Sequence, residues 1–165
     1  MSDKSPDSPV PTAVNLGELR STKCSFLPNL ILPISKTTFT WGRALGCVTV
    51  HEYPDDIRVP KTAFQISWYA PTTTSRSKRK RRTKDGEFLI TTFATHGIRV
   101  NGQPLTQCDK RGYSNYGFLR TGDIITVSYD ENEKKKLKFV CKFHYGKARH
   151  KREAGKRFQI FGRSP

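Results

Sequence analysis

The chain has 165 residues, enough for one domain with a buried core, and a formal net charge of +16. No apolar run approaches the ~18 residues of a transmembrane helix, and the first residues lack the apolar segment of a secretory signal, so we expect no membrane partner. Cys24, Cys47, Cys108 and Cys141 lack C-x-x-C spacing, which disfavours a zinc site or a disulfide framework and predicts reduced thiols in an intracellular protein.

The positive charge is concentrated in two segments. Residues 76–84 hold seven Lys or Arg and no acid, and residues 134–157 hold eleven against one acid, Glu153. The two segments carry +7 and +10, so the rest of the chain sums to −1. The body of the protein is therefore close to neutral, unlike a uniformly basic nucleic-acid-binding surface.

Alternation of apolar and polar residues predicts short strands along most of the chain. The alternation is strict in residues 63–69, where Phe64, Ile66 and Trp68 share one face. Residues 27–34 contain two prolines, which cannot donate to a strand ladder, so this segment is predicted as an edge strand. In chain order, the predicted strands are residues 15–20, 27–34, 37–41, 47–50, 63–69, 87–93, 98–100, 103–105, 123–129 and 137–144.

The number of short strands and the absence of a long amphipathic helix predict an all-β sandwich of about ten to eleven strands. Residues 1–13 are rich in Ser, Pro and Asp and are predicted to be a disordered tail. We expect the sandwich to cover residues 14–145, with a basic insertion at residues 71–86. Residues 146–165 are predicted to be a basic C-terminal extension.

Three motifs follow one another along the chain. They are Gly42-Arg43, residues 95–102 with the turn Asn101-Gly102, and residues 119–125, which are Leu-Arg-Thr-Gly-Asp-Ile-Ile. Together they resemble the forkhead-associated (FHA) family, whose pattern is Gly-Arg, Ser-x-x-His, Thr/Ser-Asn-Gly, a second Asn-Gly and Leu-x-x-Gly-Asp-x-Ile. The resemblance covers roughly residues 15–145. It implies an FHA-like β-sandwich that binds phosphothreonine peptides with loops at one end.

The resemblance assigns the phosphate to Arg43, which matches the arginine that holds it in the family. A charge-assisted hydrogen bond from a guanidinium to a phosphate oxygen is worth about 1.5–3 kcal/mol. The alternative interpretation is a surface arginine paired with Asp55 or Asp56. Both interpretations are open at the level of sequence.

The next loop departs from the family pattern. Residues 58–63, Arg-Val-Pro-Lys-Thr-Ala, stand where the family has Arg-x-Ser-x-x-His. Pro60, with neither a hydroxyl nor an N–H, replaces the phosphate-binding serine, and Ala63 replaces the structural histidine. Either the other donors of the loop rebuild a phosphate pocket, or the pocket is lost. Those donors are Arg58, Lys61 and Thr62.

The third loop keeps one family residue and changes another. Thr95 matches the Thr or Ser of the family, whereas His96 stands where an asparagine contacts the peptide backbone. A neutral histidine has one donor and one acceptor, so it can replace part of that contact. The alternative is a turn without a ligand. The residues predicted to shape turns are Gly42, Gly97, Asn101 and Gly102.

The first basic segment has two functional interpretations. It is a nuclear localisation signal or a weak contact to nucleic-acid phosphates, and few aromatic residues interleave with it to stack on bases. A solubilising loop is the alternative. We expect a nuclear protein, with the cytoplasm as a second compartment. The cations concerned are Arg76, Lys78, Arg79, Lys80, Arg81 and Arg82.

The sequence favours a binding module over an enzyme. Its four histidines are spread out, and neither a glycine-rich phosphate loop nor G-x-S-x-G occurs. We expect no metal and no cofactor. The resemblance implies a phosphorylated protein partner in nuclear signalling, in the DNA-damage response or the cell cycle. Two alternatives are a degenerate FHA scaffold that binds independently of phosphate, and nucleic-acid contact through the basic loop. The oligomeric state is undetermined.

Overall fold

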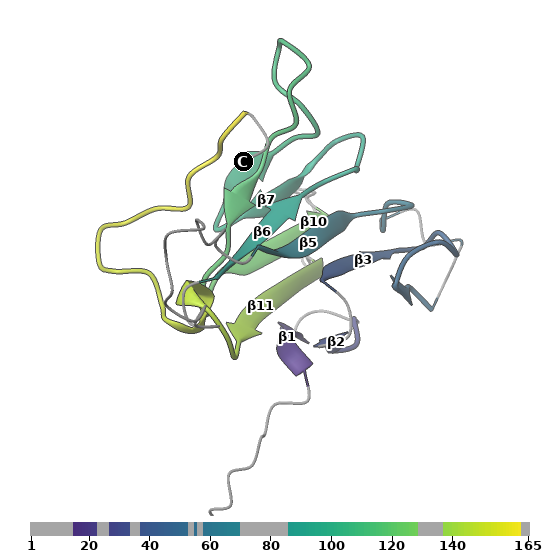
Figure 1. The fold of residues 1–165 in the computed structure, drawn as a ribbon. Coiled ribbons are helices and arrows are strands. Elements are labelled where there is room, and N and C mark those ends of the chain that lie inside the picture. Colours follow the sequence, from purple (N-terminus) through teal and green to yellow (C-terminus); the bar gives the residue numbers. More distant parts are fainter. Residues whose placement is uncertain are drawn as a thin grey trace, which may run out of the picture.

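The computed structural model describes residues 15–22, 27–33, 37–52, 55, 58–69, 86–128 and 137–162. The predicted tail, the six cations of the basic insertion and the pairing of Arg43 with Asp56 lie outside these ranges. The described chain forms two sheets that pack as a β-sandwich (Figure 1). None of the described helices is long and apolar enough to cross a membrane.

One sheet has six strands in the order β2-β1-β11-β10-β7-β8, and every neighbouring pair is antiparallel. β2 lies at an edge, as its prolines predict. The strands of this sheet are β1 (Asn15–Ser21), β2 (Leu30–Pro33), β7 (Ile98–Val100), β8 (Gln103–Leu105), β10 (Ile124–Ser128) and β11 (Leu137–Phe143).

The second sheet has five strands in the order β4-β3-β5-β6-β9. The predicted hairpin of β5 and β6 is present, with Ile66 opposite Ile90. These strands are β3 (Thr38–Gly42), β4 (Thr49–Val50), β5 (Phe64–Tyr69), β6 (Glu87–Thr91) and β9 (Gly117–Phe118). Eleven strands in two sheets confirm the predicted all-β sandwich for the described part of the chain.

Aromatic side chains from both sheets fill the centre of the sandwich. The Trp41 ring lies 5.1 Å from Phe139 and 5.7 Å from Phe64, measured between ring centroids. All three side chains are buried, as alternation predicted for Phe64. Because Trp41 directly precedes Gly42-Arg43, burial of its ring anchors the loop that follows β3.

Several strand boundaries differ from the prediction, and β9 forms where no strand was predicted. β6 ends at Thr91 instead of residue 93, because the chain then turns and Thr92 uses its hydroxyl to bind the Ala63 carbonyl oxygen at 2.7 Å. Phe93 consequently points outward and is 53% exposed. β4 is shorter than predicted, because the Cys47 N–H closes a turn on the Ala44 carbonyl oxygen at 3.1 Å.

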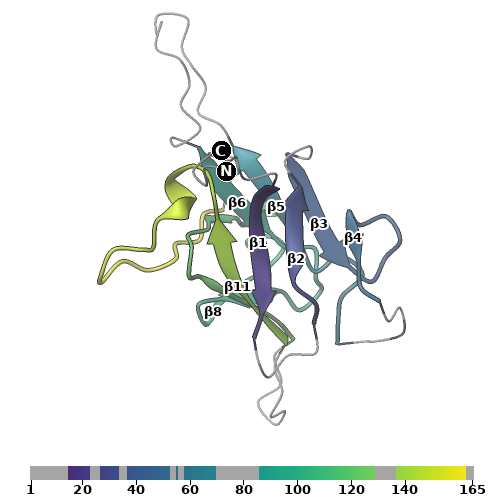
Figure 2. The same ribbon diagram turned by 90° about the horizontal axis from the view of Figure 1, so that it is seen from below.

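Residues 146–162 pack along the sandwich, and we call them the C-terminal strap (yellow-green to yellow in Figures 1 and 2). The strap begins with the 3-10 helix η2 (Lys147–Arg149), whose Ala148 is fully buried. Farther along, Phe158 is 2% exposed, and Phe161 exchanges two backbone hydrogen bonds with Tyr116. Ile160, a third apolar residue of this stretch, stays exposed.

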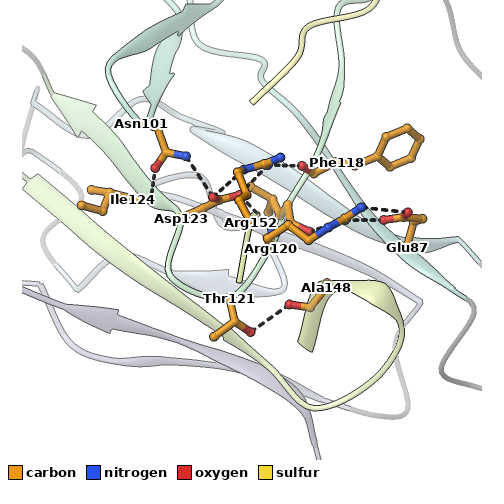
Figure 3. Close-up of polar contacts among 10 residues, drawn as sticks. Glu87, Asn101, Phe118, Arg120, Thr121, Asp123, Ile124, Ala148 and Arg152 are labelled. Atoms are coloured by element: carbon orange, nitrogen blue, oxygen red, sulfur yellow. Dashed lines mark hydrogen bonds and ion pairs between the residues drawn. The ribbon is translucent and has the colours of Figure 1, made fainter. Parts of the chain in front are cut away.

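A buried carboxylate, Asp123, joins three elements at one end of the sandwich (Figure 3). Asn101 Nδ2 donates to its Oδ1 at 2.9 Å, and the Arg120 backbone N–H donates to its Oδ2 at 2.8 Å. Arg152 of the strap donates from Nε and Nη2 to the same two oxygens at 2.9 Å and 2.7 Å. These charge-assisted bonds connect the second Asn-Gly motif, the Gly-Asp motif and the strap.

The Cys141 thiol lies close to this carboxylate. Burial raises the pKa of Cys141 above its ordinary value, the Asp123 charge raises it further, and the Arg152 charge opposes the rise. The thiol therefore stays protonated at neutral pH. We expect iodoacetamide to alkylate exposed Cys108 in the folded protein and Cys141 only after unfolding, as measured by peptide mass mapping. Equal rates for the two thiols in the folded protein would contradict this expectation.

Candidate functional site

The chain after β3 is held against the loop that precedes β5. The Arg43 N–H donates to the Pro60 carbonyl oxygen at 3.1 Å, and the Ala44 N–H donates to the Lys61 carbonyl oxygen at 2.9 Å. Gly42 permits this approach, because a Cβ there would lie only 2.2 Å from the Lys61 carbonyl oxygen. The glycine of the Gly-Arg motif thus brings Arg43 and Lys61 together.

Replacing Gly42 with alanine is expected to destabilise the fold by about 1–3 kcal/mol, because the methyl group must displace backbone atoms of the Lys61 loop. Urea unfolding measures the loss. Gly46→Ala is the matched control, since a Cβ at Gly46 meets no atom within 4 Å. Equal stability of the two variants would show that the close approach is not required.

The Arg43 side chain has one backbone contact. Its Nε–H donates to the Val59 carbonyl oxygen at 2.6 Å. Among the described residues, which include Asp55, no carboxylate pairs with Arg43. One hydrogen bond therefore orients the guanidinium, and its two terminal NH₂ groups have no partner within the described ranges.

The loops at this end of the sandwich enclose an open groove of about 810 Å³. Five of the six predicted binding residues line it, together with Gly97 of the predicted turn. Thr62 does not line it: its hydroxyl lies 3.6 Å from Cys47 Sγ. The predicted residues in the groove wall are Arg43, Arg58, Lys61, Thr95 and His96.

Sequence inspection missed Phe93 and Arg99, which also line the groove. Arg99 lies in β7 between buried Ile98 and buried Val100, so alternation alone places its side chain on the outer face. Phe93 is an aromatic residue just beyond a strand end, and only the observed end of β6 shows that it is exposed. With these two residues the groove offers both cationic and apolar surface.

The groove is cationic. Its lining includes Arg43, Arg58, Lys61 and Arg99, and no Asp or Glu is among the described residues that line it. Four like charges around one concave surface repel each other and raise the local concentration of anions. The arrangement therefore favours an anionic ligand.

The two substituted family positions lie at the groove and beneath it. Pro60 lines the groove, whereas Ala63 is fully buried. Thr92 connects the neighbouring loops there: its hydroxyl donates to the Ala63 carbonyl oxygen at 2.7 Å and accepts from the Ala94 N–H at 3.1 Å. A threonine thus fastens the loop of Thr95 and His96 to the Lys61 loop.

Replacing Thr92 with valine keeps the shape but removes the hydroxyl, leaving a buried carbonyl and a buried N–H without that partner. We expect a loss of about 1–3 kcal/mol in the free energy of unfolding. Thr92→Ser, which retains the hydroxyl, should lose less. Chemical denaturation compares the variants, and equal losses for valine and serine would remove the hydroxyl bridge from this account.

The predicted turn at Asn101-Gly102 lies at the other end of β7 from the groove. Asn101 has φ 52° and Gly102 has φ 81°, and they connect β7 to β8. The Asn101 side chain accepts from the Ile124 N–H at 2.8 Å and donates to Asp123. Asn101 and Gly102 therefore serve the fold and do not line the groove, although the Gly102 carbonyl oxygen accepts from Arg99 Nη1 at 3.1 Å.

Comparison with solved structures identifies FHA domains, whereas no family model and no curated protein matches the sequence. The FHA2 domain of Rad53, solved with a phosphotyrosyl peptide derived from Rad9, is 15% identical, covers 91% of this chain and 92% of its own, and has a TM-score of 0.67. The N-terminal FHA domain of Rad53p from S. cerevisiae, solved with a phosphothreonine peptide, is 23% identical, covers 78% and 94%, and has a TM-score of 0.52. The MEK1 FHA domain is 15% identical, covers 79% and 92%, and has a TM-score of 0.52.

Proposed function

We propose that this chain, which has the fold of FHA domains, is a module that binds phosphothreonine peptides. The observation that supports the proposal best is the cationic groove at the loop end of the sandwich, where four cations and no acid are found among the described lining residues. A phosphothreonine brings about −2 charge and three strong acceptor oxygens. A concave site with several donors and no competing carboxylate fits such a group.

Arg43 is the residue that we propose holds the phosphate. Its Nε is already bonded to the Val59 carbonyl oxygen, which aims the fork of terminal NH₂ groups and reduces the entropy lost on binding. Lys61 adds a second cation from the adjoining loop, and Thr95 adds a hydroxyl. His96 supplies one donor and one acceptor for the peptide backbone.

The proposed module acts without catalysis. The partner is a phosphorylated protein, and we propose nuclear signalling, in the DNA-damage response or the cell cycle, as its setting. The basic residues 76–84 support nuclear import, because clustered Lys and Arg are the composition of such signals.

A phosphate-independent scaffold is the second candidate function, and two residues favour it. Pro60 supplies neither a hydroxyl nor an N–H to the groove, and the buried Ala63 has no polar side chain. In this case the groove takes an acidic, unphosphorylated segment. The partner then binds in the same groove, but a phosphate group adds nothing to its affinity.

Titration with a matched peptide library separates the two functions. The library contains phosphothreonine, phosphotyrosine, threonine and glutamate at one central position, and isothermal calorimetry gives each Kd. Phosphothreonine binding at least about tenfold tighter than threonine and glutamate supports the proposal. Equal binding of all four peptides rejects it in favour of the scaffold. A preference for phosphotyrosine would replace the proposed ligand while keeping the groove.

A further inference from the structure

The C-terminal strap is held in place by side chains that turn inward. Thr121 donates from its N–H and its hydroxyl to the Ala148 carbonyl oxygen at 2.7 Å and 2.8 Å. Arg152 Nη2 donates to the Phe118 carbonyl oxygen at 2.6 Å in addition to its bonds with Asp123. Because Phe158 is buried as well, the strap follows one path along the sandwich.

Most Lys and Arg side chains of the strap remain on the surface, unlike the residues Ala148, Arg152 and Phe158 that hold it in place. Arg152 is the one Lys or Arg of the strap that is compensated by a buried carboxylate. Five further cations are exposed, and the strap contains a single acid, the exposed Glu153. The exposed cations are Lys147, Arg149, Lys151, Lys156 and Arg157. Their backbone is already ordered, so a partner need not supply the entropy of ordering it.

The strap begins at the end of the sandwich opposite the groove and then runs back along β9, where Phe161 pairs with Tyr116. The Lys147 N–H donates to the Gly86 carbonyl oxygen at 2.8 Å, next to the start of β6. The Lys61 loop precedes the other end of β5, and β5, the partner of β6, spans about 17 Å at ~3.3 Å per residue. In Figures 1 and 2 the strap and the blue loops after β3 lie on opposite sides of the sandwich.

The same end also receives the other basic part of the sequence. Residues 76–84 belong to the connection between Tyr69 and Gly86, and these two flanking residues lie at the strap end of β5 and β6. The basic insertion and the start of the strap are thus attached at one end of the domain. Their separation in the sequence conceals this arrangement.

We infer that the C-terminal strap is a second binding surface, which takes the phosphate backbone of a nucleic acid. Regularly spaced phosphates suit a row of ordered Lys and Arg side chains, and releasing condensed counterions drives such binding. Between residues 147 and 157 no Phe, Tyr or Trp occurs, so phosphate contacts by Lys and Arg dominate the proposed binding. This inference is independent of the groove and its ligand.

The test measures binding of a fluorescein-labelled DNA duplex of about 20 base pairs by anisotropy across a salt series. The variant combines Lys151→Ala, Lys156→Ala and Arg157→Ala and leaves Arg152 in place to preserve the fold. We expect at least a tenfold loss of affinity, and a log–log salt slope reduced by about 2.7, from ~0.9 for each lost phosphate contact. Phosphothreonine-peptide binding should not change.

The control removes the same charge from the groove end through Arg43→Ala, Arg58→Ala and Lys61→Ala. It should keep DNA affinity within about twofold of the wild type while losing the phosphopeptide. Equal loss of DNA affinity in the two triple variants would mean that only net charge matters, and it would overturn the inference. A strap variant with the DNA affinity of the wild type would overturn it as well. Displacement of the DNA by polyglutamate or by phosphatidylcholine–phosphatidylserine vesicles at equal charge concentration also overturns it. Thermal unfolding verifies that both variants are folded.

Discussion

Replacing Arg43 with alanine is expected to weaken binding of a phosphothreonine peptide by about 10- to 150-fold, the equivalent of about 1.5–3 kcal/mol for a charge-assisted hydrogen bond. The guanidinium has no carboxylate partner among the described residues. Removing it therefore breaks no ion pair within these residues. The loss should therefore appear chiefly in the Kd, with a smaller fall in the midpoint of thermal unfolding from the lost hydrogen bond to the Val59 carbonyl oxygen.

Arg43→Lys should fall between the wild type and Arg43→Ala, because lysine keeps the charge but cannot bind the phosphate with a planar fork. Arg20→Ala is the matched control, since Arg20 is an exposed arginine of β1 paired with Glu18 and does not line the groove. Calorimetric titration of each variant against one peptide gives the comparison. If Arg43→Ala binds as tightly as Arg20→Ala, the phosphate is held elsewhere or is not bound.

Replacing Arg152 with alanine is expected to cost about 3–5 kcal/mol of folding free energy. The change leaves the Asp123 carboxylate, whose side chain is 3% exposed, without its cation, and an uncompensated buried charge is costly. It also frees the strap from the Phe118 carbonyl oxygen. For a chain of this size the midpoint of thermal unfolding should fall by roughly 6–20 °C.

Lys151→Ala serves as the control, because Lys151 is the exposed neighbour of Arg152 and should change stability by no more than about 0.5 kcal/mol. Arg152→Lys should show an intermediate loss, since one ammonium group cannot reproduce three hydrogen bonds in a fixed fork. Differential scanning calorimetry measures all three variants. A loss for Arg152→Ala no larger than that of Lys151→Ala would mean that the strap does not support the fold.

The candidate site was only partly predictable from the sequence. The order of motifs located Arg43 and Thr95 at loops of one end, and the groove contains both. The direction of each side chain was harder to predict. Thr62 turns to Cys47, whereas Phe93 is exposed in the groove wall. Side-chain direction in a loop depends on contacts between segments, and no repeat along the chain encodes these contacts.

The role of Thr92 was not predictable either. The family pattern draws attention to Ala63, where a histidine is missing, but not to a threonine 29 positions away that binds its carbonyl oxygen. A hydroxyl on a short side chain has many potential partners within a sequence. Only the packing of the two loops selects one of them.

The sequence by itself determined the class of fold, most of the strands and the turn at Asn101-Gly102, because the alternation of side chains in strands and the backbone freedom of glycine are local properties. Tertiary structure alone decided that Arg99 joins the predicted cations at the groove and which cations the strap exposes. It also decided that Arg152 meets Asp123 and that the strap begins at the end of the sandwich where the basic insertion leaves β5 and enters β6. These contacts join residues distant in sequence, and they exist only once burial of the shared core has closed the chain on itself.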